Sequence, residues 1–275
     1  MPSWAGVLGA GPMGCWLARH LKKLGYQVIL FDLKSDLARR GAAKIGCRWA
    51  RSINQFSYDV QVVFVAVGSG NAAATILRMG EILPSSSNII DISSVKTPVV
   101  EGLKNLDRDD MVITLIHPLF GPGASSLRGK YVIFTPFRNH VRERKALAMF
   151  FKGAKVVRLG YQEHDKLMAH CMSVPRLATM ALIERWAALR SLDLTTSQKA
   201  LTLAASTMLM DSPRLFTEIV GLNPYTGEAI EEFLNKIQEL KSLDGVELER
   251  RLRRLVIRIP GMEERYRKTY QLLDG

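Results

Sequence analysis

The glycine-rich run GAGPMG at positions 9–14 constrains this chain more than any other feature of its sequence. It follows a short apolar run and opens a segment whose apolar residues have helical spacing. In a dinucleotide-binding βαβ unit, Gly9 would permit the tight turn, Gly11 would let the backbone approach a diphosphate, and Gly14 would let helix and strand pack closely. The first N–H groups of the helix would then face the phosphates. The run predicts a dinucleotide site, and a glycine-rich turn that holds no ligand is the alternative.

Asp32 ends the next β-rich run, at positions 26–31, and lies 23 residues after the first of these glycines. A carboxylate at this point accepts hydrogen bonds from the adenosine ribose and repels a 2′-phosphate, so it favours NAD over NADP. Lys34, Arg39 and Arg40 follow closely and weaken that preference. The alternative is a helix-capping or solvated aspartate.

Small residues after the strand at 60–67 suit a backbone that passes close to the cofactor, and a plain strand-to-helix turn would look the same. The residues predicted to contact the cofactor are Gly9, Gly11, Pro12, Met13, Gly14, Asp32, Val67 and Gly68.

Apolar runs alternate with helical stretches up to about residue 160, and only helical patterns follow. Continuous apolar strands separated by helices are typical of a parallel sheet covered on both faces. We therefore predict an α/β fold, with a Rossmann dinucleotide-binding domain over residues 1–160 and an all-helical domain over residues 161–275. The second domain should begin with one long helix, Glu163–Leu192, kinked at Pro175.

His117 is the first candidate for catalysis. It follows the apolar strand 111–116 and precedes PLFGPG, whose prolines and glycines suit a fixed loop. Histidine titrates near neutral pH and is the commonest general base. The alternative is a histidine hydrogen-bonded at a strand end for structural reasons.

The run DISSVK at positions 91–96 follows another strand end, where doubly wound folds bind ligands. Ser94 could present its hydroxyl to substrate or nicotinamide, or cap the next helix. Lys96 could neutralise an anion, or lie on the surface. His20 and His140 are expected to be solvated, and His164 and Asp165 to begin the long helix in a structural role.

The net charge and the cysteines of the sequence limit which classes of function are possible. The net charge is +12, and residues 1–160 carry all of the excess. This suits an anionic cofactor and substrate, although nucleic-acid binding and an ordinary solvated surface remain alternatives. Three scattered cysteines, expected to be buried, indicate a reducing, cytoplasmic compartment without a disulfide framework or zinc site. No apolar run is long enough to span a membrane, and the N-terminal run leaves no room for a signal peptide.

The order and spacing of five runs resemble those of prephenate and arogenate dehydrogenases. These runs are Gly9–Gly14, Asp91–Lys96, His117–Pro122, Gly129–Pro136 and Glu163–Ala169. The segment DSPRLFTEIVGLNPY at positions 211–225 resembles a later helix of the same family. The resemblance covers roughly residues 5–225, and HPLFGP beside ISSVK is its most specific part.

The resemblance implies a Rossmann domain followed by a helical domain through which two subunits dimerise. It also implies NAD-dependent oxidation and decarboxylation of prephenate or arogenate. His117 would accept the alcohol proton, and Ser94 would help to orient that histidine and the substrate. Two positions depart from the family pattern: Ser173 replaces a histidine, and Lys199 replaces an arginine that grips a carboxylate.

We expect an NAD-dependent enzyme of tyrosine synthesis, with NADP less favoured, that acts on a small anionic substrate as a homodimer. The residues predicted to bind substrate are Ser94, Lys96, His117, Gly121, Arg176 and Lys199. One alternative is a related dehydrogenase of another small anionic hydroxy or imino acid. A remote one is a non-catalytic NAD-sensing or nucleic-acid-binding protein.

Overall fold

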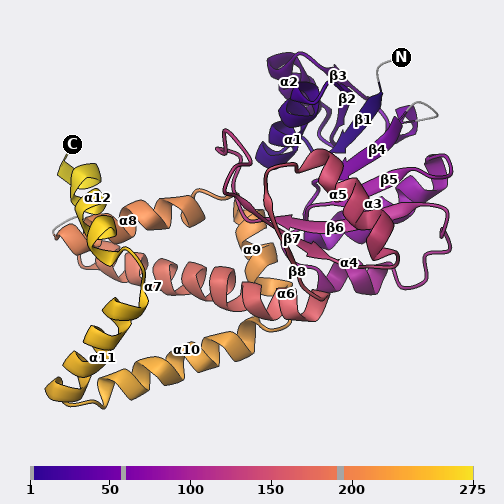
Figure 1. The fold of residues 1–275 in the computed structure, drawn as a ribbon. Helices are drawn as coiled ribbons and strands as arrows, with labels where there is room; N and C mark the ends of the chain where they lie inside the picture. The colour runs from indigo at the N-terminus through magenta and orange to yellow at the C-terminus, as the bar shows by residue number, and fades with distance from the viewer. Residues whose placement is uncertain (1–2, 57–59, 191–194, 275) are drawn as a thin grey trace. The chain divides into compact units, whose positions relative to one another are not determined.

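The computed structural model describes residues 3–56, 60–190 and 195–274. It divides into two compact units, unit 1 (Met1–Asp165) and unit 2 (Lys166–Gly275). The α/β class with a following helical part is confirmed (Figure 1).

Unit 1 is built on one sheet with the strand order β3-β2-β1-β4-β5-β6-β7-β8. All neighbouring strands are parallel except β6 and β7, which are antiparallel. The strands are β1 (Trp4–Leu8), β2 (Gln27–Phe31), β3 (Arg48–Trp49), β4 (Val60–Val65), β5 (Asn88–Asp91), β6 (Val112–Pro118), β7 (Tyr131–Thr135) and β8 (Lys155–Arg158).

Helices cover both faces of this sheet. They are α1 (Pro12–Lys23), α2 (Ser35–Ile45), α3 (Ser69–Ile82), α4 (Thr97–Gly102) and α5 (His140–Phe150), with a 3-10 turn η1 (Ile53–Gln55). Along β4, Val62 and Phe64 pack in the core layer of α1, α2 and α5, whereas Val63 and Val65 pack in that of α3 and α4. A strand buried on both faces needs such a continuous apolar run.

The carboxyl ends of β2, β1, β4 and β5 lie side by side at one edge of the sheet. The backbone continues the ladder beyond them: Gly9 N–H donates to Phe31 O, Ala66 N–H to Leu8 O, and Ile92 N–H to Val65 O. Because β6 is parallel to β5, its last residues reach the same edge. The predicted cofactor loop and His117 therefore belong to one side of unit 1.

Two strands and one strand direction were not predicted. β3 has two residues, and β8 is exposed along its whole length. The predicted parallel sheet has one exception, because β7 runs antiparallel to β6 and pairs Phe134 with Ile116.

The helical part begins with α6 (Tyr161–Met168), a π-helical turn η2 (Ala169–Ser173) and α7 (Val174–Ala188). The predicted single helix is therefore widened before Pro175, which has no N–H to donate to the preceding turn. Its predicted end at Leu192 lies outside the described residues. The remaining helices are α8 (Thr196–Leu209), α9 (Pro213–Gly221), α10 (Thr226–Lys241), α11 (Gly245–Arg258) and α12 (Met262–Asp274).

Candidate active site

The loop between β1 and α1 requires its glycines. Gly9 has φ +97°, and a Cβ there would overlap Ala66 O. A Cβ at Gly14 would overlap Gly9 O, whereas one at Gly11 would meet open space. Pro12 and Met13 form the first turn of α1, where the fixed φ of proline fits. The loop thus packs tightly at Gly9 and Gly14, and space is left beside Gly11, as the binding of a diphosphate requires.

Asp32 follows β2 and lies beside this loop. Its Oδ2 accepts from Ala10 N–H at 2.8 Å, and its Oδ1 accepts from Lys34 N–H at 2.8 Å. The residue is half-buried. It both braces the glycine-rich loop and places a negative charge at the end of β2.

The turn after β4 also has a conformation that favours glycine. Gly68 has φ +90° and is the N-cap of α3, and Val67 before it is half-buried. This places both predicted cofactor residues at the carboxyl edge.

His117 is the sixth residue of β6 and is 4% exposed. Its Nδ1 lies 3.0 Å from Nε2 of His164. Nδ1 of His164 lies in turn 2.7 Å from Oδ1 of Asp165, and both of these side chains are fully buried. Three side chains from β6 and the start of α6 thus form a continuous hydrogen-bonded row.

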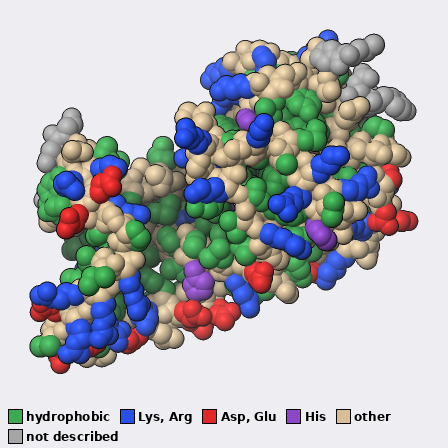
Figure 2. All heavy atoms as spheres, viewed as in Figure 1, with side chains coloured by type: hydrophobic (Ala, Val, Ile, Leu, Met, Phe, Trp, Pro, Cys, Tyr) green, Lys and Arg blue, Asp and Glu red, His purple; other side chains and the backbone are tan. Residues whose placement is uncertain are grey.

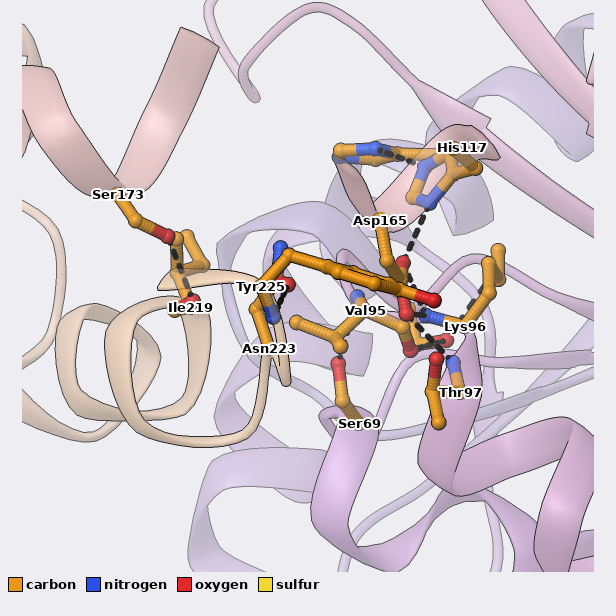
Figure 3. Close-up of polar contacts among 12 residues, drawn as sticks. Ser69, Val95, Lys96, Thr97, His117, Asp165, Ser173, Ile219, Asn223 and Tyr225 are labelled. Atoms are coloured by element: carbon orange, nitrogen blue, oxygen red, sulfur yellow. Dashed lines mark hydrogen bonds and ion pairs between the residues drawn. The ribbon is translucent and has the colours of Figure 1, made fainter. Parts of the chain in front are cut away.

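Asp165 also caps a different helix. Its carboxylate accepts from Lys96 N–H at 2.8 Å and from Thr97 N–H at 2.7 Å, at the N-terminus of α4 (Figure 3). The sequence predicted a structural role for His164 and Asp165 at the start of their own helix, and it missed their contacts with His117 and α4. The spacing in sequence, 47 residues between the histidines, carries no local signal for them.

Burial and hydrogen bonds shift the pKa values of His164 and Asp165 in opposite directions. Burial lowers the pKa of His164 from its ordinary 6.5, against the hydrogen bond with Asp165. Burial alone would raise the pKa of Asp165, but hydrogen bonds from His164 and from the N–H groups of Lys96 and Thr97 outweigh it and hold that pKa low. At neutral pH the row therefore contains a neutral His164 and an ionised Asp165.

A pH effect on stability follows from this burial. The unfolded chain binds the His164 proton at a higher pH than the folded protein does, so the free energy of unfolding should fall as pH drops below 6.5. Urea unfolding between pH 8 and 5 measures this slope. His164→Gln should flatten it; an unchanged slope would assign the effect to other groups.

Lys96 is fully buried, so the alternative of a surface lysine is wrong. Its ammonium contacts Asp91 Oδ2 at 2.6 Å, Ile116 O at 2.7 Å and Ser93 Oγ at 3.2 Å. Burial lowers the pKa of Lys96, and Asp91 opposes that shift. The side chain joins the ends of β5 and β6, directly before His117.

Ser94 and Gly121 both lie on loops after these strands. Ser94 is half-buried and does not cap α4, whose N-cap is Lys96 and whose first N–H groups bind Asp165. Gly121 is exposed in the loop after His117. That loop is fixed to α1, because Trp16 Nε1 donates to Ala124 O at 2.7 Å.

The candidates in unit 2 lie on different helices. Ser173 is buried, donates to Ile219 O and accepts from the hydroxyl of Thr226. Arg176 is 6% exposed and pairs with Asp211 at 2.7 Å. Lys199 is exposed on α8.

Two minor expectations are wrong. Cys171 is exposed, and Cys15 and Cys47 are half-buried, whereas all three were expected to be buried. His20 is half-buried rather than solvated, because its ring stacks on Trp16 and its Nε2 lies 2.6 Å from Phe150 O.

The basic excess forms no single stripe on the face drawn in Figure 2, where Lys and Arg side chains are scattered over unit 1. Among the described helices, none combines the length and apolar content needed to cross a membrane.

Comparisons with known proteins agree with this geometry. Residues 5–135 match the model of the NAD-binding domain of 6-phosphogluconate dehydrogenase. The "probable arogenate/prephenate dehydrogenase" of Methanocaldococcus jannaschii is 25% identical over 248 residues, which are 86% of this chain and 55% of that protein. The prephenate dehydrogenase (NADP+) of Saccharomyces cerevisiae is 23% identical over 190 residues, which are 67% of this chain and 42% of that protein.

A solved structure extends the similarity to the whole fold. The prephenate dehydrogenase of Aquifex aeolicus, in complex with hydroxyphenyl propionate and NAD+, has a TM-score of 0.79 at 20% identity, covering 94% of this chain and 97% of that one. The chain is thus similar to prephenate and arogenate dehydrogenases in sequence and in fold. The chain spans about half the length of the curated relatives it matches.

Proposed function

We propose that this chain catalyses the NAD-dependent oxidative decarboxylation of prephenate to 4-hydroxyphenylpyruvate, or of arogenate to tyrosine, in tyrosine synthesis. One observation carries the proposal. The buried imidazole of His117 lies at the same sheet edge as a glycine-rich loop that stays open above Gly11.

The residues present fit a bound NAD. Gly9, Gly11 and Gly14, with Pro12 and Met13, would hold the diphosphate at the N-terminus of α1. Asp32 would accept hydrogen bonds from the adenosine ribose, and Val67 and Gly68 would line the cofactor. The nicotinamide would supply the hydride acceptor.

The chain's own part in the reaction is proton transfer and orientation. His117 would accept the alcohol proton as the hydride departs, and Ser94 would orient the substrate and this imidazole. Loss of the carboxylate as carbon dioxide then gives an aromatic ring, which makes the reaction strongly favourable. In unit 1, Lys96 and Gly121 are the further proposed substrate contacts, and in unit 2 Arg176 and Lys199 stay predictions from the sequence.

A second candidate is a related dehydrogenase for another small anionic hydroxy or imino acid. The buried Ser173, bonded to Ile219 and Thr226, favours it, because the family pattern has a histidine there. An assay of NAD reduction with prephenate, arogenate and several 2- and 3-hydroxy acids distinguishes the candidates. Turnover of the hydroxy acids alone would reject the first proposal.

Asp32→Asn should shift cofactor preference toward NADP. The variant removes the charge that repels a 2′-phosphate but keeps an oxygen that can accept from Ala10 N–H. We expect the ratio of kcat/KM for NAD over NADP to fall about 10- to 100-fold, or about 1.4–2.7 kcal/mol. Asp36→Asn, on the exposed start of α2, is the control, and an equal shift in both variants would contradict the role of Asp32.

We also propose that the chain forms a homodimer through its helical unit. In α11, Leu248, Leu252, Leu255 and Val256 share a helical stripe, and all four are exposed. Apolar stripes of this kind mark protein interfaces.

Leu252→Glu together with Leu255→Glu should therefore weaken self-association at least about 100-fold, or about 2.7 kcal/mol. Sedimentation equilibrium measures the dissociation constant. Arg254→Glu on the same helix is the control, and a monomeric wild type would contradict the proposal.

A further inference from the structure

We propose that His164 and Asp165 are positioning residues that fix His117 in the tautomer with a proton on Nδ1, so that Nε2 carries the lone pair that accepts the substrate proton. The inference rests on the proposed function for its chemical purpose. Its structural content, the tautomer, can be tested without any substrate.

The row is continuous and buried. His117 Nδ1 lies 3.0 Å from His164 Nε2, and His164 Nδ1 lies 2.7 Å from Asp165 Oδ1. Each distance is that of a hydrogen bond, and the three side chains are at most 4% exposed. Two protons must therefore be shared along the row, one at each contact.

Asp165, at the end of the row away from His117, determines which atom of the first contact carries the proton. Both carboxylate oxygens of Asp165 accept backbone N–H groups, from Lys96 at 2.8 Å and Thr97 at 2.7 Å (Figure 3). An oxygen held this way is an acceptor, and these hydrogen bonds keep the pKa of the carboxyl low. The proton between Asp165 and His164 therefore sits on His164 Nδ1.

The proton on His164 Nδ1 then determines the role of the other nitrogen of that ring. Burial lowers the pKa of this residue, so the ring is neutral and carries one proton, which Asp165 already fixes on Nδ1. Its Nε2 is consequently an acceptor. The proton of the next contact must come from His117 Nδ1, and this leaves the lone pair of His117 on Nε2.

This direction matters for the reaction. As the alcohol O–H bond breaks, its proton would form a new N–H bond at His117 Nε2, and a bound NAD would supply the acceptor for the hydride that leaves the carbon. His117 becomes an imidazolium, and its Nδ1–H bond to His164 becomes charge-assisted. The negative charge of Asp165, one ring away, stabilises that cation. With the opposite tautomer, Nε2 would carry a hydrogen and could accept nothing.

The row also restrains the ring mechanically. Asp165 binds the N-terminus of α4, and Lys96 at that terminus binds Ile116 O, the residue before His117. The imidazole is therefore held from its backbone and from its Nδ1 at once. This is the kind of support that keeps a catalytic group within reach of its target.

The first test reads the tautomer directly. Nitrogen-15 NMR of histidine-labelled wild type distinguishes a protonated from an unprotonated ring nitrogen, and His117→Asn identifies the His117 signals by their loss. We expect a protonated Nδ1 and an unprotonated Nε2 for His117 near neutral pH, with His164 neutral. A protonated Nε2 on His117, or a doubly protonated His164, would overturn the inference.

The second test uses a matched pair of variants. In His164→Gln, one amide can accept from His117 and donate to Asp165, whereas His164→Leu can do neither. We expect kcat to fall about 100-fold in the leucine variant and less than about 10-fold in the glutamine variant, with KM and NAD affinity little changed. His140→Leu, on an exposed surface of α5, controls for replacing a histidine. Equal kcat values in the two His164 variants would overturn a positioning role.

The two tests separate the inference from the proposed function. If prephenate and arogenate are not turned over but His117 shows the expected tautomer, the function fails and the positioning row stands. If turnover is present but the tautomer is reversed, the function stands and the row fails. If His164→Leu does not fold, the wild-type spectrum still decides.

Discussion

Replacing His117 by asparagine is expected to lower kcat about 1,000-fold, with the affinity for NAD changed less than about twofold. An amide has no basic nitrogen at neutral pH, so it cannot accept the alcohol proton. A loss of this size corresponds to about 4 kcal/mol of transition-state stabilisation. The cofactor loop is formed by other residues, at the end of β1, so its shape should not depend on this imidazole.

Two measurements check this prediction. Steady-state turnover with the preferred substrate gives kcat, and titration calorimetry with NAD gives the dissociation constant. His140→Asn is the control, because His140 is exposed on α5. Turnover close to that of wild type would remove His117 from the role of base, whereas lost NAD affinity would indicate damage to the fold.

Lys96→Met should lower the free energy of unfolding by about 3–5 kcal/mol. The ammonium is fully buried and meets Asp91, Ser93 and Ile116 O, so methionine fills the space but leaves the Asp91 carboxylate buried without its cation. Breaking one partner of a buried pair costs far more than the pair contributes when intact. Urea denaturation gives the difference directly.

The matched control is Lys104→Met, which removes an exposed lysine paired with Glu101. Exposed pairs contribute little, so this variant should unfold almost as wild type does. Similar losses of unfolding free energy in the two variants would show that burial of the Lys96 ion pair does not cause the effect. KM of the folded Lys96→Met variant also tests whether Lys96 binds a substrate anion, since loss of stability alone would leave KM unchanged.

Local sequence patterns predicted those parts of unit 1 that repeat over several residues. The run at β4 is apolar because it is buried on both faces. Gly14 is required by its contact with Gly9 O in the same loop, and Gly9 is required by its positive φ and its contact with Ala66 O. β3 could not be predicted, since two residues carry no periodicity. The direction of β7 depends on pairing with β6, which no pattern within β7 records.

The candidate site was predicted only in part, for a related reason. His117 follows its strand directly, so its place at the sheet edge could be read locally. The sequence leaves two alternatives for Lys96, an anion-binding residue and a surface lysine. Only the folded structure, in which Lys96 is buried against Asp91, excludes the surface lysine. His164 and Asp165 have an ordinary helix-start pattern, and their role depends on contacts 47 and 69 residues away.

The position of Asp165 has a consequence for how the chain acquires its shape during synthesis. When a ribosome has released residues up to Gly160, every strand of the sheet has emerged, but α4 still lacks the carboxylate that caps it and His117 lacks its neighbouring ring. A nascent or truncated chain that stops there would carry the glycine-rich loop beside a proposed site that lacks two of its side chains. Only when Asp165 has emerged can the contacts at that edge form, so the proposed site is completed later than the sheet itself.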